Sequence, residues 1–302
     1  MSVLLRTSGG PGPPLVSLNG RPPSIRDHQA VAQLLVKLLM APSFVVGASL
    51  VARRFGPRVG GLVAGQPVVA GPILHAYALA HGASFAAGAA AGTLLGLISL
   101  IAFSVAYGRL AGRLPWAPCM LAGWLAFAAF TAGFSALSIP DGVALALAGL
   151  AIAAGIALLP RPGPGLPPSE APPRWDLPLR AACALALVLT LTAIAGWLGP
   201  QLSGLLAPFP IIATVLATFT HGQRGVDEML RLIRGMLSGF VAFALFFFTL
   251  AVALRGLGTG AAFVLATFVA LLTQALAFTI TRPRIPALAT PDPPRLGRAP
   301  LS

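Results

Sequence analysis

Two stretches of the chain, FGPRVGGLVAGQPVVA at residues 55–70 and LGPQLSGLLAPFPIIA at residues 198–213, carry the same pattern of glycine and proline. Each has a Gly-Pro pair near its start, a Gly-Leu pair in the middle and a proline three residues before its final alanine. Glycines and prolines that coincide at one offset are rare by chance, even in a chain rich in Ala and Leu. The two stretches therefore predict an internal repeat with a period of 143 residues.

The composition of this 302-residue chain is typical of a membrane protein. Hydrophobic residues make up 57% of it, and only 9% of the residues are charged, against about 25% in an average soluble domain. The mean hydropathy is +0.87. These values exclude a water-soluble globular fold, and they exclude a disordered chain, which requires low hydrophobicity. The net charge of +13 is therefore assigned first to membrane topology, and no nucleic-acid partner is expected.

Apolar stretches of about the length that crosses a bilayer recur nine times. A hydrocarbon core of about 30 Å needs about 20 apolar helical residues. Turn residues separate the stretches, among them Gly199-Pro200, and residues 222–234 are predicted to form a charged loop. The Pro-rich connection 160–178 is predicted to be an extended linker. The predicted spans are 31–52, 60–80, 84–107, 116–138, 142–159, 179–198, 203–221, 233–254 and 259–281.

The basic residues divide unevenly between the two predicted sides of the membrane. If all nine stretches cross, one side carries 15 of the 20 basic residues and the other carries five. The richer side holds the loops 53–58, 108–114, 160–180 and 222–234 and the C-terminal tail. The positive-inside rule then places the C-terminus in the cytoplasm and the N-terminus outside, in a bacterial inner membrane.

The period also predicts how the two copies are oriented. One period contains five spans, an odd number, so the second copy is inverted with respect to the first. The expected fold is an all-α polytopic transmembrane bundle of about nine spans, with two inverted four-span repeats joined by a linker helix. Its predicted parts are a flexible tail at 1–29, a first repeat at 30–141, a linker helix and Pro-rich loop at 142–178, a second repeat at 179–282 and a flexible cytoplasmic tail at 283–302. Part of residues 1–29 is alternatively an over-extended gene start.

Proline interrupts the second and the seventh span at equivalent positions. Gln66 and Pro67 mark the first interruption, and Pro208 and Pro210 mark the second. Each proline removes a helical hydrogen bond, and the released groups need protein or water as partners inside a membrane. A pair of interrupted spans in corresponding halves indicates a transporter binding site. The simpler alternative is a pair of kinks that serve only packing.

Few polar side chains lie near these interruptions. His75 is about two turns beyond Pro67, and Gln274 lies in the ninth span. Lys37, the single lysine, lies about 10 Å inside the first span at 1.5 Å per residue. Snorkelling to the interface explains a basic group at that depth, and anion binding or gating is the alternative. Arg180 holds the equivalent place at the start of the sixth span, where snorkelling is easy.

Glycines four residues apart form two stripes that predict close helix packing. Such stripes join helices either within one protomer or across a homodimer. The residues are Gly88, Gly92 and Gly96 in the third span, and Gly235 and Gly239 in the eighth.

Residue patterns that would indicate catalysis or a bound cofactor do not occur in the sequence. All seven acidic residues fall outside the predicted spans, so no carboxylate is available there for proton or sodium coupling. Cys119 and Cys183 are isolated from each other. No metal-ligand cluster, phosphate-binding loop or nucleophile arrangement is found. We therefore expect no enzyme, no cofactor and no metal.

The run LLVKLLMAPSFVVGASLVARRFGPRVGGLVAGQPVVAGP at 34–72 resembles the start of the GlpM-like family of small bacterial inner-membrane proteins. The likeness lies in Lys37, in the basic turn at 53–58 and in the Pro67 interruption. The second half is similar through Arg180 and the 199–210 region. The resemblance implies two fused, inverted four-span units and adds little about biochemical activity.

The leading functional hypothesis from the sequence is a secondary transporter or exporter of an unidentified small metabolite, with its site between the second and seventh spans. The alternative is a non-transporting accessory or assembly protein of an envelope or polysaccharide system, and a passive channel comes third. The expected partners are the lipid bilayer, a small-molecule substrate and a second copy of the chain in a homodimer.

Overall fold

The computed structural model of the chain describes residues 25–68, 70–135, 137, 139–164, 173–206 and 209–281. Within its helices, the side chains of residues 25–38, 80, 192–206 and 280–281 fall outside this description. The part that is described is helical, without strands. Its helices are α1 (Ile25–Phe55), α2 (Pro57–Ala64), α3 (Ala70–His81), α4 (Ala83–Leu110), α5 (Trp116–Ser135), α6 (Asp141–Leu158), α7 (Asp176–Leu206), α8 (Ile211–Ala253) and α9 (Thr259–Thr281).

Five of these helices are long and apolar enough to cross a bilayer. Within the described residues they are α4, α5, α6, α8 and residues Thr259–Thr279 of α9. The described part of the chain is therefore all-helical and has the character of a membrane protein. The nine-span arrangement and the inversion of the two halves remain predictions.

The predicted second span is broken where the sequence places proline. Gly56 has a φ of 91°, in the left-handed region that favours glycine, and it turns the chain from α1 into α2. α2 ends at Ala64, and α3 begins at Ala70 beyond Pro67. The Pro67 ring has no N–H to donate into the preceding turn, so the helix stops there. A second break separates the end of α7 at Leu206 from the start of α8 at Ile211.

One predicted turn in the second half is wrong, and one predicted loop is shorter than expected. α7 continues through Gly199 and Pro200, where a turn is expected; a single proline removes one hydrogen bond, and membrane helices tolerate this. The expected loop 222–234 is shorter than predicted, because Met229, Leu230 and Ile233 extend the buried face of α8 into it. The chain still turns inside this stretch, at Gly225, whose φ of 83° departs from helical geometry and divides α8 into two limbs.

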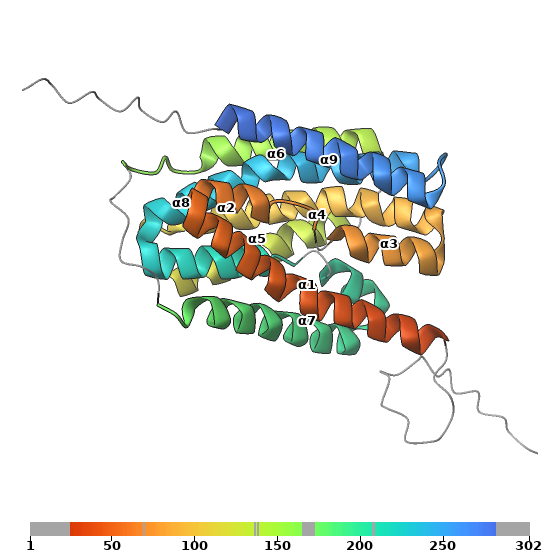
Figure 1. The fold of residues 1–302 in the computed structure, drawn as a ribbon, viewed down its shortest axis with the longest axis horizontal. Coiled ribbons are helices and arrows are strands. Elements are labelled where there is room, and N and C mark those ends of the chain that lie inside the picture. The colour runs from red at the N-terminus through yellow and green to blue at the C-terminus, as the bar shows by residue number, and fades with distance from the viewer. Residues whose placement is uncertain are drawn as a thin grey trace, which may run out of the picture.

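The second limb of α8 is the centre of the bundle. α8 packs against α2, α4, α6 and α9, while α1 and α7 lie side by side along one edge (Figure 1). The contact between α2 and α8 is very close. A Cβ added to Gly61 would meet the Leu232 carbonyl oxygen, and one added to Gly235 would meet the Arg58 carbonyl oxygen. Glycine at these places lets the two helix backbones touch.

The other glycine positions differ in their surroundings. Gly239 faces the Leu62 carbonyl oxygen of α2, so it belongs to the same close contact as Gly235. Gly96 is buried. Gly88 and Gly92 are exposed, and a Cβ added to either would meet no atom within 4 Å. The α8 stripe therefore packs within the protomer, whereas Gly88 and Gly92 face open space.

Candidate functional site

The break between α2 and α3 contacts α9 through two glutamines. Gln66 lies in the break, and its Nε2 donates a hydrogen bond of 2.5 Å to Oε1 of Gln274 on α9. The same Nε2 also lies 3.3 Å from the carbonyl oxygen of Leu62, at the last turn of α2. The side chain of Gln66 thus satisfies a carbonyl near the helix end and links the break to another helix. Sequence reasoning selected both glutamines, and the fold brings them together.

Gln274 keeps one polar group without a partner. Its Nε2 is buried and makes no hydrogen bond to any residue that the structure describes. Leaving a buried donor unpaired costs about 1–3 kcal/mol. A ligand oxygen placed beside this amide would recover part of that free energy. The Gln66–Gln274 pair is therefore the polar group best placed to meet a substrate at the break.

The remaining residues of the expected site are spread over several places. The ring of His75 on α3 packs edge-on against Phe263 of α9, with centroids 4.7 Å apart. Pro67 lies within the α2–α3 break, and Pro210 precedes the first turn of α8. Pro208 and the side chain of Lys37 lie outside the described residues.

The second break has a different neighbour from the first. Phe209, which precedes Pro210, packs against the rings of Trp124 and Phe127 on α5. The indole Nε1 of Trp124 also donates to Oγ1 of Thr214 at 3.0 Å. The first break meets α9 and the second limb of α8, so the contacts described at the two breaks do not join them into one site.

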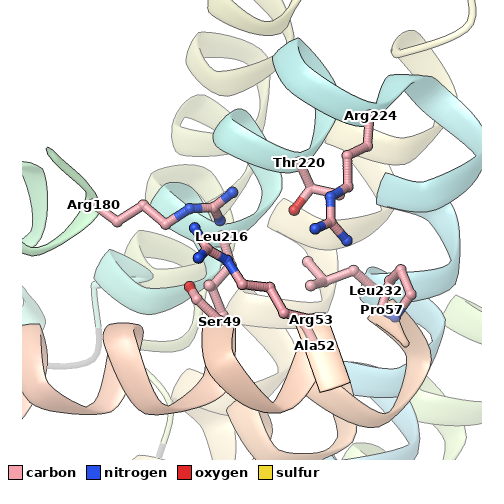
Figure 2. Close-up of a pocket in the computed structure, with 9 residues that line it drawn as sticks. All are labelled: Ser49, Ala52, Arg53, Pro57, Arg180, Leu216, Thr220, Arg224 and Leu232. Atoms are coloured by element: carbon pink, nitrogen blue, oxygen red, sulfur yellow. The ribbon is translucent and has the colours of Figure 1, made fainter. Parts of the chain in front are cut away.

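A small hollow lies elsewhere, where the first turn of α2 meets α1, α7 and both limbs of α8 (Figure 2). Its empty volume is about 310 Å³ when the space open to solvent at its entrance is included. The space left between its side chains is much smaller and holds about one water molecule. Three of the lining side chains are arginines from different helices. The lining residues are Ser49, Ala52, Arg53, Pro57, Arg180, Leu216, Thr220, Arg224 and Leu232.

A buried carboxylate organises two of these arginines. Asp176, the first residue of α7, is fully buried. Its Oδ2 accepts a hydrogen bond of 2.6 Å from Nη2 of Arg53 on α1. Both of its oxygens accept from Nε of Arg180, at 2.9 and 3.0 Å, and Oδ1 accepts from Nε2 of Gln223 on α8 at 2.7 Å. One carboxylate thus ties α1, α7 and α8 together.

Arg180 is held inside the protein, contrary to the snorkelling expected of it. It is 5% exposed, and its guanidinium lies 4.9 Å from the centre of the Phe219 ring. Its Nη2 donates to Oε1 of Gln223 at 3.3 Å. Snorkelling places a charged head in water, but here Asp176, Gln223 and an aromatic face replace the water.

Opposing effects set the ionisation of Asp176, which precedes the predicted span 179–198. Burial by itself raises the pKa of its carboxyl. The hydrogen bonds from Arg53, Gln223 and Arg180, together with the charge of Arg180, outweigh burial, so the pKa of Asp176 lies below its ordinary value. The carboxylate is therefore ionised at neutral pH.

This lowered pKa makes part of the protein's stability dependent on pH. Because the folded-state pKa is below the unfolded value of about 3.9, the carboxylate stabilises the fold above that pH and loses this effect as the pH falls through the folded value. We expect thermal unfolding of wild type and of Asp176→Asn to differ most at neutral pH, with the two midpoints converging in acid. A difference in midpoint that stays constant down to strongly acidic pH would contradict this assignment.

Sequence reasoning missed most of the residues of this hollow. It treated Arg53 and Arg224 as topology signals and Asp176 as part of a linker. The one local signal was the spacing of Asp176 and Arg180, which are four residues apart and so share a helix face. The sequence could not show that Arg53 and Gln223, from distant parts of the chain, reach the same carboxylate.

The hollow and the glutamine pair offer no recognisable metal site. Among the described residues, no group of three or more His, Cys, Asp or Glu side chains is arranged to hold a metal ion. A scan against protein-family models, a search of curated proteins and a search of solved structures each return no match. The resemblance to the GlpM-like family stays an expectation from the sequence, and function is inferred from the geometry.

Proposed function

We propose that this protein is a secondary transporter or exporter of a small metabolite in the bacterial inner membrane. The observation that carries the proposal is the helix broken between Ala64 and Ala70, with Gln66 bonded to the half-buried Gln274 at the break. In a membrane, broken helices are tolerated only against protein or a water-filled cavity, and such breaks bind substrates in transporters. The second break, before Ile211, means that the other half of the chain also has a proline-marked helix interruption.

The arrangement of the basic segments supports the proposed topology. Arg53 and Arg224 line one hollow, so the end of α1 and the bend of α8 lie at the same end of the bundle. Arg109 donates to the Leu158 carbonyl, and Arg234 to the Leu159 carbonyl, so the α4–α5 and α6–α7 connections join that end. The positive-inside rule makes it cytoplasmic. Nine spans in two inverted halves, joined by α6, account for this gathering.

Flux through reconstituted protein tests the proposal. Alanine at position 67 or 210 restores the missing N–H and lets the helix extend across the break. We expect Pro67→Ala and Pro210→Ala to lower saturable uptake into proteoliposomes by about tenfold or more, because the substrate groups are then misplaced. A panel of small metabolites of either charge would be screened with the wild type first.

Pro118→Ala is the matched control. Pro118 lies in the first turn of α5, where no intrahelical hydrogen bond is lost. This variant should transport like wild type. If wild type moves no compound of the panel, the transporter proposal is overturned. If flux survives in both break variants, the breaks are not the site.

The accessory or assembly function remains the second candidate, and one observation favours it. The contact of α2 with α8 at Gly61 and Gly235 is backbone against backbone, and the hollow beside it is almost filled. Such packing suits a fixed scaffold. A stable protein with no flux of any tested compound would support this second function.

A further inference from the structure

Three arginines that approach one hollow leave it with more positive charge than its own carboxylate balances. Arg53 comes from α1, Arg180 from α7 and Arg224 from the last turn before Gly225 in α8. Together with Asp176 they give a net charge of +2. Like charges held this close repel one another, so the hollow attracts an anion.

Arg224 is the arginine best able to bind one. Arg53 and Arg180 are both engaged by Asp176, whereas Arg224 makes no ion pair with any residue that the structure describes. It is only half-buried, so its side chain has freedom to move. Figure 2 shows its guanidinium beside Thr220, across the hollow from the guanidinium groups of Arg53 and Arg180.

We propose that the hollow between Arg53, Arg180 and Arg224 binds a small phosphate dianion, either inorganic phosphate or the phosphate group of a monoester. Guanidinium groups pair with phosphate through two parallel hydrogen bonds, and several arginines around one anion are the usual arrangement for recognising it. A phosphate group carries a charge of about −1.5 to −2 at pH 7. That charge matches the excess of +2 in the hollow.

The charge balance also separates two sources of phosphate. The phosphodiester of a membrane lipid carries one negative charge and would leave the hollow positive. A monoester or inorganic phosphate neutralises it. The inner space of the hollow is small, so the anion enters as Arg224 swings toward the mouth, which a side chain without an ion pair can do at little cost.

This inference names a substrate class and rests in that respect on the proposed transport function. The hollow lies at the basic end of the bundle, away from the Gln66–Gln274 pair in the break of the second span. It would serve as the cytoplasmic entry or release site for a phosphate-bearing substrate. Binding of phosphate is itself independent of whether transport follows.

Thermal unfolding of the full chain in nanodiscs of neutral lipid tests binding. Sodium phosphate is titrated against sodium chloride of equal ionic strength, and the unfolding midpoint is recorded. We expect a saturable rise of the midpoint with phosphate only, because a ligand that binds the folded state stabilises it. Arg224→Gln should weaken phosphate binding by about tenfold or more, since a charge-assisted contact is lost.

Arg113→Gln is the matched control. Arg113 is exposed in the α4–α5 connection, and its substitution removes the same charge from the same end of the bundle. It should bind phosphate like wild type. An equal loss in both variants indicates a general charge effect and overturns the site, as does a midpoint that phosphate does not move.

Nanodiscs with anionic phospholipid form the second arm of the experiment. The free-phosphate assignment is overturned if anionic lipid raises the unfolding midpoint of the wild type but not of Arg224→Gln, and if added phosphate then causes no further rise.

Failure of this inference is distinguishable from failure of the transporter proposal. Phosphate binding without any flux overturns transport and leaves the site standing. Saturable flux of another solute, with no phosphate binding, overturns the site and leaves transport standing.

Discussion

Replacing Gly235 with valine is expected to destabilise the bundle by about 3 kcal/mol or more, at the upper end of what overpacking costs. A Cβ at this position would overlap the carbonyl oxygen of Arg58, and that oxygen belongs to the backbone of α2. A flexible side chain could move aside, but a helix backbone moves only with its whole turn. The measurement is unfolding of the purified protein in mixed micelles as the fraction of denaturing detergent rises.

Gly92→Val provides the matched control for this experiment. The same substitution is made on a helix glycine in a stripe of the same spacing, but Gly92 is exposed and has no atom within 4 Å of the added Cβ. Valine favours a helix over glycine by a few tenths of a kcal/mol. We therefore expect no loss of stability. Equal losses for both variants would show that the α2–α8 contact is not as close as described.

The second large effect is expected from Asp176→Asn, which leaves the buried guanidinium of Arg180 without its counterion. Breaking a buried ion pair on one side typically costs about 3–5 kcal/mol, because the remaining charge has lost both water and partner. Arg53 loses its acceptor in the same change. The expected result is a large fall in the thermal unfolding midpoint at neutral pH.

Asp141→Asn is the control for this charge removal. Asp141, whose side chain is 12% exposed, pairs with Arg255, whose side chain is 57% exposed. The substitution therefore leaves a cation in water and should cost much less than leaving Arg180 buried without its partner. Adding Arg180→Gln to Asp176→Asn should restore part of the lost stability, since it removes the buried guanidinium charge that no longer has a counterion. If Asp141→Asn lowers the unfolding midpoint as much as Asp176→Asn does, the ion-pair network around Asp176 does not stabilise the fold in the way described.

The sequence predicted the class of this protein and the broken helix correctly because both depend on local chemistry. High hydrophobicity and scarce charge indicate a membrane environment wherever the helices pack. Pro67 cannot donate a backbone hydrogen bond, so a break near it follows from covalent structure. The break before Ile211 follows in the same way. Local reasoning failed at Gly199-Pro200, where α7 continues because a membrane helix tolerates a single proline. At 222–234 it found the turn, which lies at Gly225, but made the loop too long.

The candidate site was only partly predictable. Gln66 and Gln274 stand out as rare polar residues in apolar segments, but only the fold shows that they meet. Asp176 was assigned to a linker, because it follows a Pro-rich stretch and precedes the apolar run. Its partners Arg53 and Gln223 are far from it in sequence, and no periodicity connects them. Lys37, which the sequence singled out, has a side chain outside the described residues.

The sequence by itself determined that this chain forms apolar helices, where proline interrupts them and which segments carry the positive charge. Each of these depends on residues close together in the chain. Only the tertiary structure decided which glycine stripe is a helix contact, since Gly92 and Gly235 have the same local pattern and different neighbours. It also decided that the basic segments enclose a buried carboxylate at Asp176, because a charge is stabilised by whatever surrounds it in space.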